Sequence, residues 1–219
     1  MNKVDISVIL ASSIHESKNA VGSLMYQLQT LKSEFEGPLD QVDKINNIEE
    51  GLKQLNDEWV EYLYLFKLAS DGYDLQTDNL QVNEFLDDQV FVLSQSATAK
   101  NLTLDFECDE ALLGNFDERL MTSVISTAVY NALRFAKSKI TLSAKRLDEH
   151  LVFSIEDDGP GFSDNLDEEQ DFLQNNTGLG LYFTKLSAQA HSIEDRHGYL
   201  EKSSSCTLNG ACLNIYLPQ

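Results

Sequence analysis

The sequence has no long apolar run and few basic residues, and each shortage excludes a class of protein. No stretch approaches the roughly 20 consecutive apolar residues that a membrane-spanning helix needs. The start, MNKVDISVIL, has too short an apolar segment for a signal peptide. We therefore expect no membrane span and a cytoplasmic location. Only 16 basic residues stand against 36 acidic ones, a formal net charge of −20. This charge repels phosphate backbones, so we expect no nucleic-acid partner.

Cysteine is also scarce. Cys108, Cys206 and Cys212 are unevenly spaced, form no Cys-x-x-Cys pair and have no histidines at zinc-binding spacing. We interpret them as packed thiols of a reducing compartment. The chain has 219 residues, of which 42% are hydrophobic, and its mean hydropathy is −0.28. That is enough for one or two compact domains.

The first third of the chain carries two helical seams. Their apolar residues alternate in steps of three and four, which is typical of coiled-coil-like packing. The segment EGPLD separates the first seam from the second. Because two helices alone leave much of each seam in water, we expect a hairpin over residues 1–72 that pairs with a second copy into a homodimeric four-helix bundle. The seams comprise Val21, Leu24, Leu28, Leu31 and Phe35, then Ile45, Ile48, Leu52, Leu55, Trp59, Tyr62 and Phe66.

Helical and strand patterns alternate in the rest of the chain. They indicate an α+β protein in which the hairpin precedes an α/β sandwich over residues 75–219, one sheet with helices over one face. The expected helices cover 82–100, 117–138 and 177–190, and the expected strands cover 102–108, 139–144, 151–157 and a hairpin within 203–218.

Three stretches of this second domain carry candidate chemistry. In SIEDDGPGF, Asp157 can accept a hydrogen bond from an exocyclic amine, while Gly159 and Gly161 let the backbone approach a flat ring. Acid–glycine clusters also make ordinary turns. NNTGLGLYFTK opens a helix whose free N–H groups attract phosphate, or it is a simple capped helix start. Asn131 is either an Mg²⁺ ligand or a satisfied boundary asparagine.

The ordered set of motifs resembles the sensor histidine kinases over nearly the whole chain. SSIHESKNAV contains a His-Glu-x-x-Asn motif in the hairpin, NALRFA is similar to the N box, DDGPGF to the G1 box and NTGLGL to the G2 box. By this resemblance, residues 1–72 are a dimerisation and histidine phosphotransfer hairpin. Residues 75–219 are an HATPase-like ATP-binding domain of the GHKL superfamily.

The resemblance implies a role for each motif residue. His15 would be the phosphoacceptor, Glu16 its general base, and Asn19 the residue that orients water when a response regulator is dephosphorylated. Asn131 would coordinate Mg²⁺, and Asp157 would contact the adenine amine. The remaining residues of the nucleotide site would be Arg134, Phe135, Gly159, Gly161, Thr177, Gly178, Leu179, Gly180 and Leu181.

The surroundings of His15 agree with this role. Extending the first seam backwards from Val21 leaves His15 beside it, so we expect its ring to reach solvent. Asn19 is four residues on and shares that helix face. A zinc-binding HExxH motif is excluded because Asn19 stands in place of the second histidine. On the hairpin alone, His15 could equally be an ordinary surface histidine. We expect the other three histidines, His150, His191 and His197, to have structural roles.

Four features depart from the family pattern. Thr127 stands where the N box often has an earlier asparagine, and Asn176 stands where the G2 box usually opens with glycine. The lid segment FSDNLDEEQDFLQNNT is short and acidic, with Phe172 as its only F-box candidate. We also expect no sensor domain before the hairpin, which makes a separate sensor protein a candidate partner.

We therefore expect an ATP-dependent protein-histidine kinase. It would use ATP and Mg²⁺ to phosphorylate His15, and would pass the phosphoryl group to an aspartate of a response regulator receiver domain. Two alternatives stay open. One is a histidine phosphotransferase with a degenerate ATP-binding domain, and the other is a non-catalytic dimeric adaptor in which His15 beside Glu16 is a coincidence.

Overall fold

The computed structural model of the chain describes residues 6–34, 39–70, 72–162, 177–205 and 207–219, and within these the side chains of 6–13, 33–34, 39–40, 43 and 177–178 are not described. Of the positions named above, Phe35, Phe172, Asn176 and Cys206 lie outside the described residues. The chain divides into two units, Met1–Tyr73 and Asp74–Gln219.

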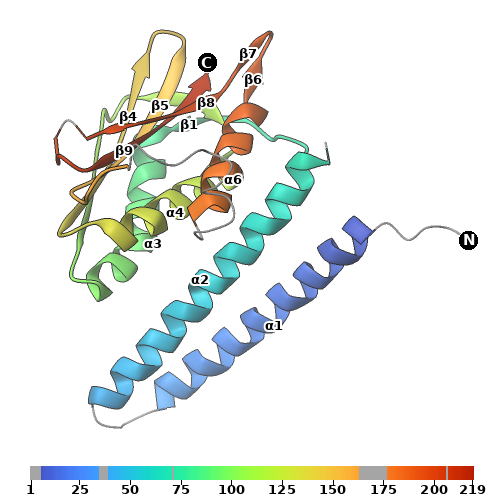
Figure 1. The fold of residues 1–219 in the computed structure, drawn as a ribbon, viewed down its shortest axis with the longest axis vertical. Coiled ribbons are helices and arrows are strands. Elements are labelled where there is room, and N and C mark those ends of the chain that lie inside the picture. The colour runs from blue at the N-terminus through green and yellow to red at the C-terminus, as the bar shows by residue number, and fades with distance from the viewer. Residues whose placement is uncertain (1–5, 35–38, 71, 163–176, 206) are drawn as a thin grey trace, which may run out of the picture. The chain divides into compact units, whose positions relative to one another are not determined.

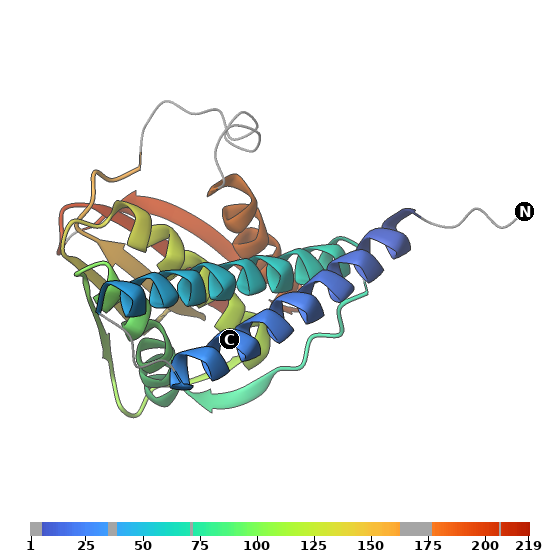
Figure 2. The same cartoon turned by 90° about the horizontal axis from the view of Figure 1, so that it is seen from below.

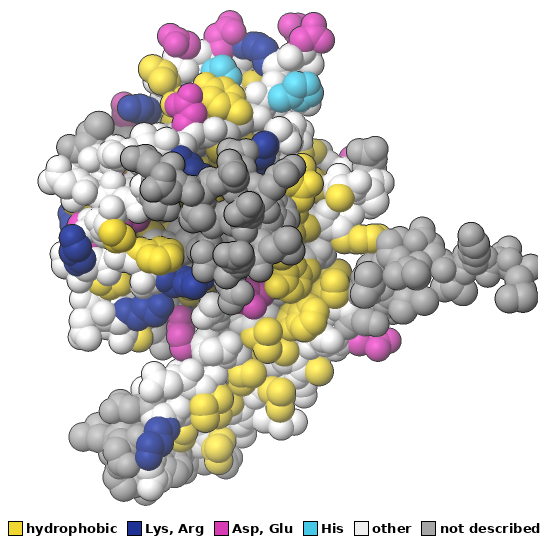
Figure 3. Space-filling model, viewed as in Figure 1, with side chains coloured by type: hydrophobic (Ala, Val, Ile, Leu, Met, Phe, Trp, Pro, Cys, Tyr) yellow, Lys and Arg dark blue, Asp and Glu magenta, His cyan; other side chains and the backbone are white. Residues whose placement is uncertain are grey.

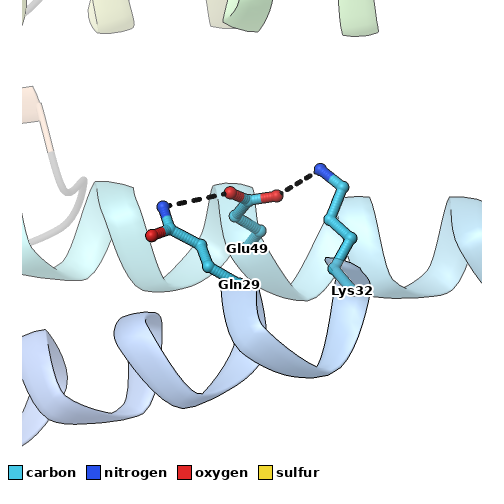
Figure 4. Close-up of polar contacts among 3 residues, drawn as sticks. All are labelled: Gln29, Lys32 and Glu49. Carbon is cyan, nitrogen blue, oxygen red and sulfur yellow. Dashed lines mark hydrogen bonds and ion pairs between the residues drawn. The ribbon is translucent and has the colours of Figure 1, made fainter. Parts of the chain in front are cut away.

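The first unit is a hairpin of two long helices, α1 (Ile6–Glu34) and α2 (Leu39–Ala69), which lie side by side (Figure 1). A polar contact fixes their register near the turn. The Lys32 ammonium lies 2.6 Å from one carboxylate oxygen of Glu49, and the Gln29 amide donates to the other oxygen at 3.5 Å (Figure 4). Lys32 also lies in the last turn of α1, where a positive charge complements the helix dipole.

The predicted seams are only partly buried in the single chain. Val21 is buried, whereas Leu24, Leu31, Ile48 and Leu55 are 51%, 54%, 55% and 38% exposed. Figure 3 shows hydrophobic side chains following the hairpin along its length. Exposed apolar residues at seam spacing form a stripe of the kind that marks an association surface.

The second unit is built around a five-stranded sheet in the order β2-β4-β5-β9-β8. β2 pairs with β4 in parallel, and the other neighbours are antiparallel. The strands are β2 (Thr103–Cys108), β4 (Lys139–Leu147), β5 (His150–Asp157), β8 (Tyr199–Ser204) and β9 (Ala211–Pro218). The helices are α3 (Val82–Ala99), α4 (Glu118–Phe135) and α6 (Thr177–Ala190).

The three helices lie over one face of this sheet (Figures 1 and 2). Side-chain alternation explains this arrangement, because successive residues of a strand point to opposite faces. In β4 the buried residues Ile140, Leu142 and Ala144 alternate with more exposed neighbours. α4 contributes an apolar stripe that includes Leu120, Met121, Val124, Ile125, Ala128 and Val129. The expected α/β sandwich is thus confirmed.

Two short strand pairs were not predicted. β1 (Asp78–Gln81) pairs with β3 (Leu113–Phe116), and β6 (Ser192–Ile193) pairs with β7 (Arg196–His197).

None of the helices in the described ranges combines the length and apolar character that crossing a membrane requires.

Candidate functional site

The hairpin presents His15, Glu16 and Asn19 on α1, and all three are exposed. This matches the expected access of the His15 ring to solvent. The Nδ2 atom of Asn19 lies 3.3 Å from Nδ1 of His15. Residues four apart lie on the same face of a helix, whereas adjacent residues do not face each other. The structure therefore brings Asn19 to the ring, and it records no contact between the described side chains of Glu16 and His15.

In the second unit, Asp157 ends β5 and is buried, with 6% of its surface exposed. Two backbone N–H groups donate to its Oδ1 atom, from Gly159 at 2.7 Å and from Ala211 at 3.4 Å. No described residue is recorded as donating to Oδ2. One oxygen thus anchors the side chain, and the other is available to a hydrogen-bond donor from a ligand.

Glycine is required around Asp157 because the backbone there is crowded. A Cβ atom at Gly159 would lie 2.6 Å from the carbonyl oxygen of Phe135. A Cβ atom at Gly210 would lie 2.2 Å from the carbonyl oxygen of Asp157. Gly210 was not predicted as a site residue, although its Asn-Gly dipeptide is a signal for a tight turn between strands. Gly161 adopts a positive φ of 82°, which favours glycine.

The N-box residues lie on the second half of α4. Asn131 is half-buried, and its side-chain amide has no recorded partner among the described residues. Arg134 and Phe135 are exposed at the end of the helix, where the guanidinium lies 5.6 Å from the centre of the Phe135 ring. Thr127, one turn before Asn131, is half-buried. The structure thus places a free amide and a cation–aromatic pair on successive turns.

The G2-box residues open α6, as predicted. Thr177 is its first residue, Gly180 is buried, and Leu179 and Leu181 are half-buried. The Thr184 hydroxyl donates to the Gly180 carbonyl at 2.8 Å. α6 packs beside α4 (Figure 1). Free N–H groups at the start of such a helix form a favourable environment for phosphate.

His191 is a structural residue, as expected. It is 3% exposed, its Nδ1 atom lies 2.8 Å from the Ser187 carbonyl, and its Nε2 atom accepts from the backbone N–H of Asp117 at 3.1 Å. Burial lowers the pKa of His191, against opposing contributions from the Ser187 carbonyl and the Asp117 carboxylate. Asp117 also caps α4 by accepting from the Leu120 N–H at 3.0 Å. This link between the start of α4 and the end of α6 was not predicted from the sequence.

The other two histidines lie in the C-terminal strands. His150 packs edge-on against Tyr199 and Tyr216, which stack with ring centres 4.3 Å apart. Desolvation, followed by the hydrogen bond that the Tyr216 hydroxyl donates to Glu201, raises the pKa of Tyr216 to about 12. His197 is exposed in β7. Neither of the two described cysteines, Cys108 and Cys212, forms a disulfide.

Comparison with known proteins identifies relatives of both parts of the chain. The profile of the family described as "Histidine kinase-, DNA gyrase B-, and HSP90-like ATPase" matches residues 116–219. Sensor histidine kinase CpxA of Escherichia coli (strain K12) is 30% identical over 148 residues, which cover 62% of this chain and 30% of CpxA. Virulence sensor histidine kinase PhoQ of Salmonella typhimurium (strain 14028s / SGSC 2262) is 23% identical over 216 residues, 94% of this chain and 42% of PhoQ. The chain thus spans less than half the length of these relatives.

Solved structures share the fold across both units. Histidine kinase AdeS of Acinetobacter baumannii matches with a TM-score of 0.63 at 15% identity, covering 91% of this chain and 95% of that one. Full-length ShkA, solved in complex with AMPPNP, matches with a TM-score of 0.68 at 18% identity, covering 95% of this chain and 45% of ShkA.

Proposed function

We propose that the chain is an ATP-dependent protein-histidine kinase, because it is similar to sensor histidine kinases and its residues 116–219 match the family of histidine kinase-, DNA gyrase B- and HSP90-like ATPases. His15 accepts the γ-phosphoryl group of ATP and passes it to an aspartate on a response regulator receiver domain. The protein thus works as the transmitter of a two-component system.

The observation that carries this proposal is the environment of Asp157. Asp157 is buried as a residue, yet only its Oδ1 atom has recorded donors among the described residues. Its Oδ2 atom is not among the described side-chain atoms that are both buried and unpaired, so it is open to a ligand. The exocyclic amine of adenine is a donor that fits Oδ2. The bound nucleotide in the structure of ShkA, AMPPNP, supports an adenine nucleotide as the ligand of this fold. The start of α6, with Thr177, Gly178, Leu179, Gly180 and Leu181, is the expected phosphate-binding segment.

Asn131 fits the role of a magnesium ligand. Mg²⁺ prefers oxygen donors and commonly takes one or two from the protein and the rest from phosphates and water. The uncommitted, half-buried amide of Asn131 supplies such an oxygen. When bound, the ion neutralises charge that develops on the transferring phosphoryl group. Arg134, exposed one turn after Asn131, adds a positive charge on the same helix face.

The contact between Asn19 and His15 bears on the nucleophile. Because Nδ1 faces Asn19, Nε2 is the ring nitrogen left open to attack phosphorus. An amide carries both a donor and an acceptor, so a half-turn of the Asn19 side chain presents Oδ1 to an Nδ1–H group and leaves the lone pair of Nε2 free. The N–P bond forms as the bond from phosphorus to ADP breaks, and the ring then releases its Nδ1 proton. Glu16 is the proposed base for this proton, and its side chain must rotate toward the ring to accept it, because no contact between the two described side chains is recorded.

We also propose that Asn19 acts in the dephosphorylation of the response regulator. A positioned amide can hold a water molecule in line with the phosphorus of a phospho-aspartate without giving or taking a proton. The exposure of both Asn19 and His15 leaves them accessible to a docked receiver domain.

The exposed stripe on the hairpin supports a homodimer. A second copy would cover Leu24, Leu31, Ile48 and Leu55 and complete a four-helix bundle. Light scattering in solution tests this, since a dimer has twice the 24.6 kDa mass of one chain.

Incubation of the purified protein with γ-labelled ATP and Mg²⁺ tests the kinase proposal. An acid-labile, base-stable label on the protein is the expected result, because phosphohistidine hydrolyses in acid. Nucleotide binding without any label would instead favour a phosphotransferase with a degenerate ATP-binding domain. The absence of both nucleotide binding and label would favour an adaptor.

A further inference from the structure

Asp158, the residue after Asp157, joins two parts of the nucleotide-binding unit that are distant in sequence. Its Oδ1 atom accepts from the N–H groups of Lys137 at 2.7 Å and Ser138 at 3.0 Å. Its Oδ2 atom accepts from the Ser138 N–H at 3.0 Å and from the Ser138 hydroxyl at 2.5 Å. All these donors lie in the short connection between α4 and β4. The Asp158 carboxylate thus accepts hydrogen bonds from the N–H groups and the hydroxyl group that follow the end of α4.

Two backbone features strengthen this junction, which we call the Asp158 bridge. The N–H of Asp158 donates to the carbonyl of Lys139 at 3.3 Å. The absence of a side chain at Gly159 lets the Asp157–Gly159 turn lie directly against the carbonyl of Phe135, the last residue of α4. The end of α4 and the end of β5 are therefore fixed to each other by backbone contact as well as by the carboxylate.

The carboxylate keeps its charge across the physiological range. Desolvation alone would raise the pKa of Asp158, but the hydrogen bonds from Ser138, Lys137 and Lys139 outweigh it and lower the pKa well below its usual value. Hydrogen bonds to an ionised acceptor are shorter and stronger than those between neutral groups. The bridge is thus present at any pH at which the protein would bind nucleotide.

The position of the bridge relates it to both ends of the proposed ATP site. Asn131 lies one helical turn before Phe135 on α4, and Asp157 lies immediately before Asp158. An α-helix is stiff over one turn, so fixing the end of α4 also fixes Asn131 relative to Asp157. The bridge is exposed to solvent on one side, and neither of its carboxylate oxygens is left for the nucleotide.

We propose that Asp158 is a positioning residue that sets the spacing between the adenine-binding carboxylate of Asp157 and the magnesium-binding amide of Asn131, and that it thereby couples Mg²⁺ binding to nucleotide binding. This inference rests on the proposed ATP site. A ligand that reaches two sites gains affinity only when their spacing matches its own length. Loosening the bridge leaves the adenine site and the Mg²⁺ site intact, but it removes the gain in affinity that comes from occupying both sites at once.

The test measures the dissociation constant of a non-hydrolysable ATP analogue for the full chain, with Mg²⁺ and with EDTA. The ratio of the two constants reports the coupling. Asp158→Ala is expected to reduce this ratio by about tenfold, a typical size for coupling between sites, while the constant in EDTA stays unchanged. Asp158→Asn keeps an oxygen for the Lys137 and Ser138 N–H groups, so it is expected to restore most of the ratio.

The matched control is Asp87→Ala. Asp87 is an exposed carboxylate on α3, so its loss changes the charge equally without touching a residue of the bridge. Ser138→Ala removes one hydrogen bond of the bridge and is expected to reduce the ratio to a smaller extent. If thermal unfolding shows that Asp158→Ala is not folded, Ser138→Ala replaces it in the test.

The outcomes separate the inference from the function on which it rests. A wild-type protein that binds no nucleotide overturns the proposed function. A wild-type protein with Mg²⁺-enhanced binding, together with unchanged ratios in Asp158→Ala and Ser138→Ala, overturns the coupling. An equal loss of affinity with and without Mg²⁺ also overturns it, because this would place the role of Asp158 at the adenine end alone.

Discussion

The amide of Asn19 lies one helical turn from His15, with its Nδ2 atom 3.3 Å from the Nδ1 atom of the ring. Both side chains are exposed, so water competes for this hydrogen bond and its net contribution is small. The contact orients the ring without burying it. It leaves Nε2 facing away from Asn19, where a phosphoryl donor or a receiver domain can reach it.

The two proposed activities of this helix face should therefore separate in Asn19→Ala. Loss of one exposed hydrogen bond, worth about 0.5 kcal/mol, should change the rate of autophosphorylation by no more than about threefold. Dephosphorylation of the response regulator should slow clearly, because Asn19 is the group proposed to hold the attacking water. The measurement is the decay of purified phospho-regulator with wild-type and variant protein. Equal decay rates would remove the role, and a parallel loss of autophosphorylation would indicate damage to the helix.

Asp157→Asn should weaken ATP binding without unfolding the protein. The amide oxygen can still accept from the N–H groups of Gly159 and Ala211, whereas the charged acceptor for the adenine amine is lost. A charge-assisted hydrogen bond contributes roughly 1.5–3 kcal/mol, so the dissociation constant should rise roughly tenfold to 100-fold. Titration of ATP measures it, with Asp105→Asn as the surface control. An unchanged constant would locate the adenine elsewhere.

Gly210→Ala should destabilise the second unit. The added methyl group would lie 2.2 Å from the Asp157 carbonyl oxygen and 2.6 Å from the Gly159 backbone nitrogen. Overpacking of this kind costs about 1–3 kcal/mol. Gly22→Ala is the matched control, because no atom lies within 4 Å of a Cβ at Gly22 in α1, and it should stabilise the helix by about 0.5–1 kcal/mol. Urea unfolding measures both. Equal stability of the two variants would contradict the crowding around Asp157.

His191 should make stability depend on pH. Burial lowers its pKa in the folded protein, so on acidification the unfolded chain takes up a proton near pH 6.5 before the folded chain does. The free energy of unfolding should therefore fall as the pH drops below about 6.5, by at most about 1.4 kcal/mol per pH unit, until the folded pKa is reached. Urea unfolding at several pH values should show this dependence in wild-type protein and in the exposed-site control His197→Gln. His191→Gln should lose it, and an identical slope in this variant would contradict the assignment.

Periodicity predicted the long elements because their burial follows from their own sequence. The stripe of α4 and the alternation of β4 are visible in single segments. β1 was missed because its four residues, DNLQ, have only one apolar member and gain their order by pairing with β3. The exposure of the seam residues Leu24 and Leu31 in a single chain was also expected, because two helices alone leave much of each seam in water.

The candidate site was predictable to the extent that its residues form local motifs. Asp157 and Gly159 stand in one short stretch, whereas Gly210 and Ser138 reach Asp157 and Asp158 only through the folding of the sheet. The same limit applies to His191, whose bond to the backbone of Asp117 links residues 74 positions apart. Contacts of this kind leave no periodic trace in a sequence.

The location of the phosphoryl group tests the central claim most directly. Wild-type protein, His15→Gln and His197→Gln are each incubated with γ-labelled ATP and Mg²⁺, and nucleotide affinity is measured in parallel. The account predicts an acid-labile label on wild-type and His197→Gln, none on His15→Gln, and the same nucleotide affinity in all three. Label of equal amount on His15→Gln would contradict it.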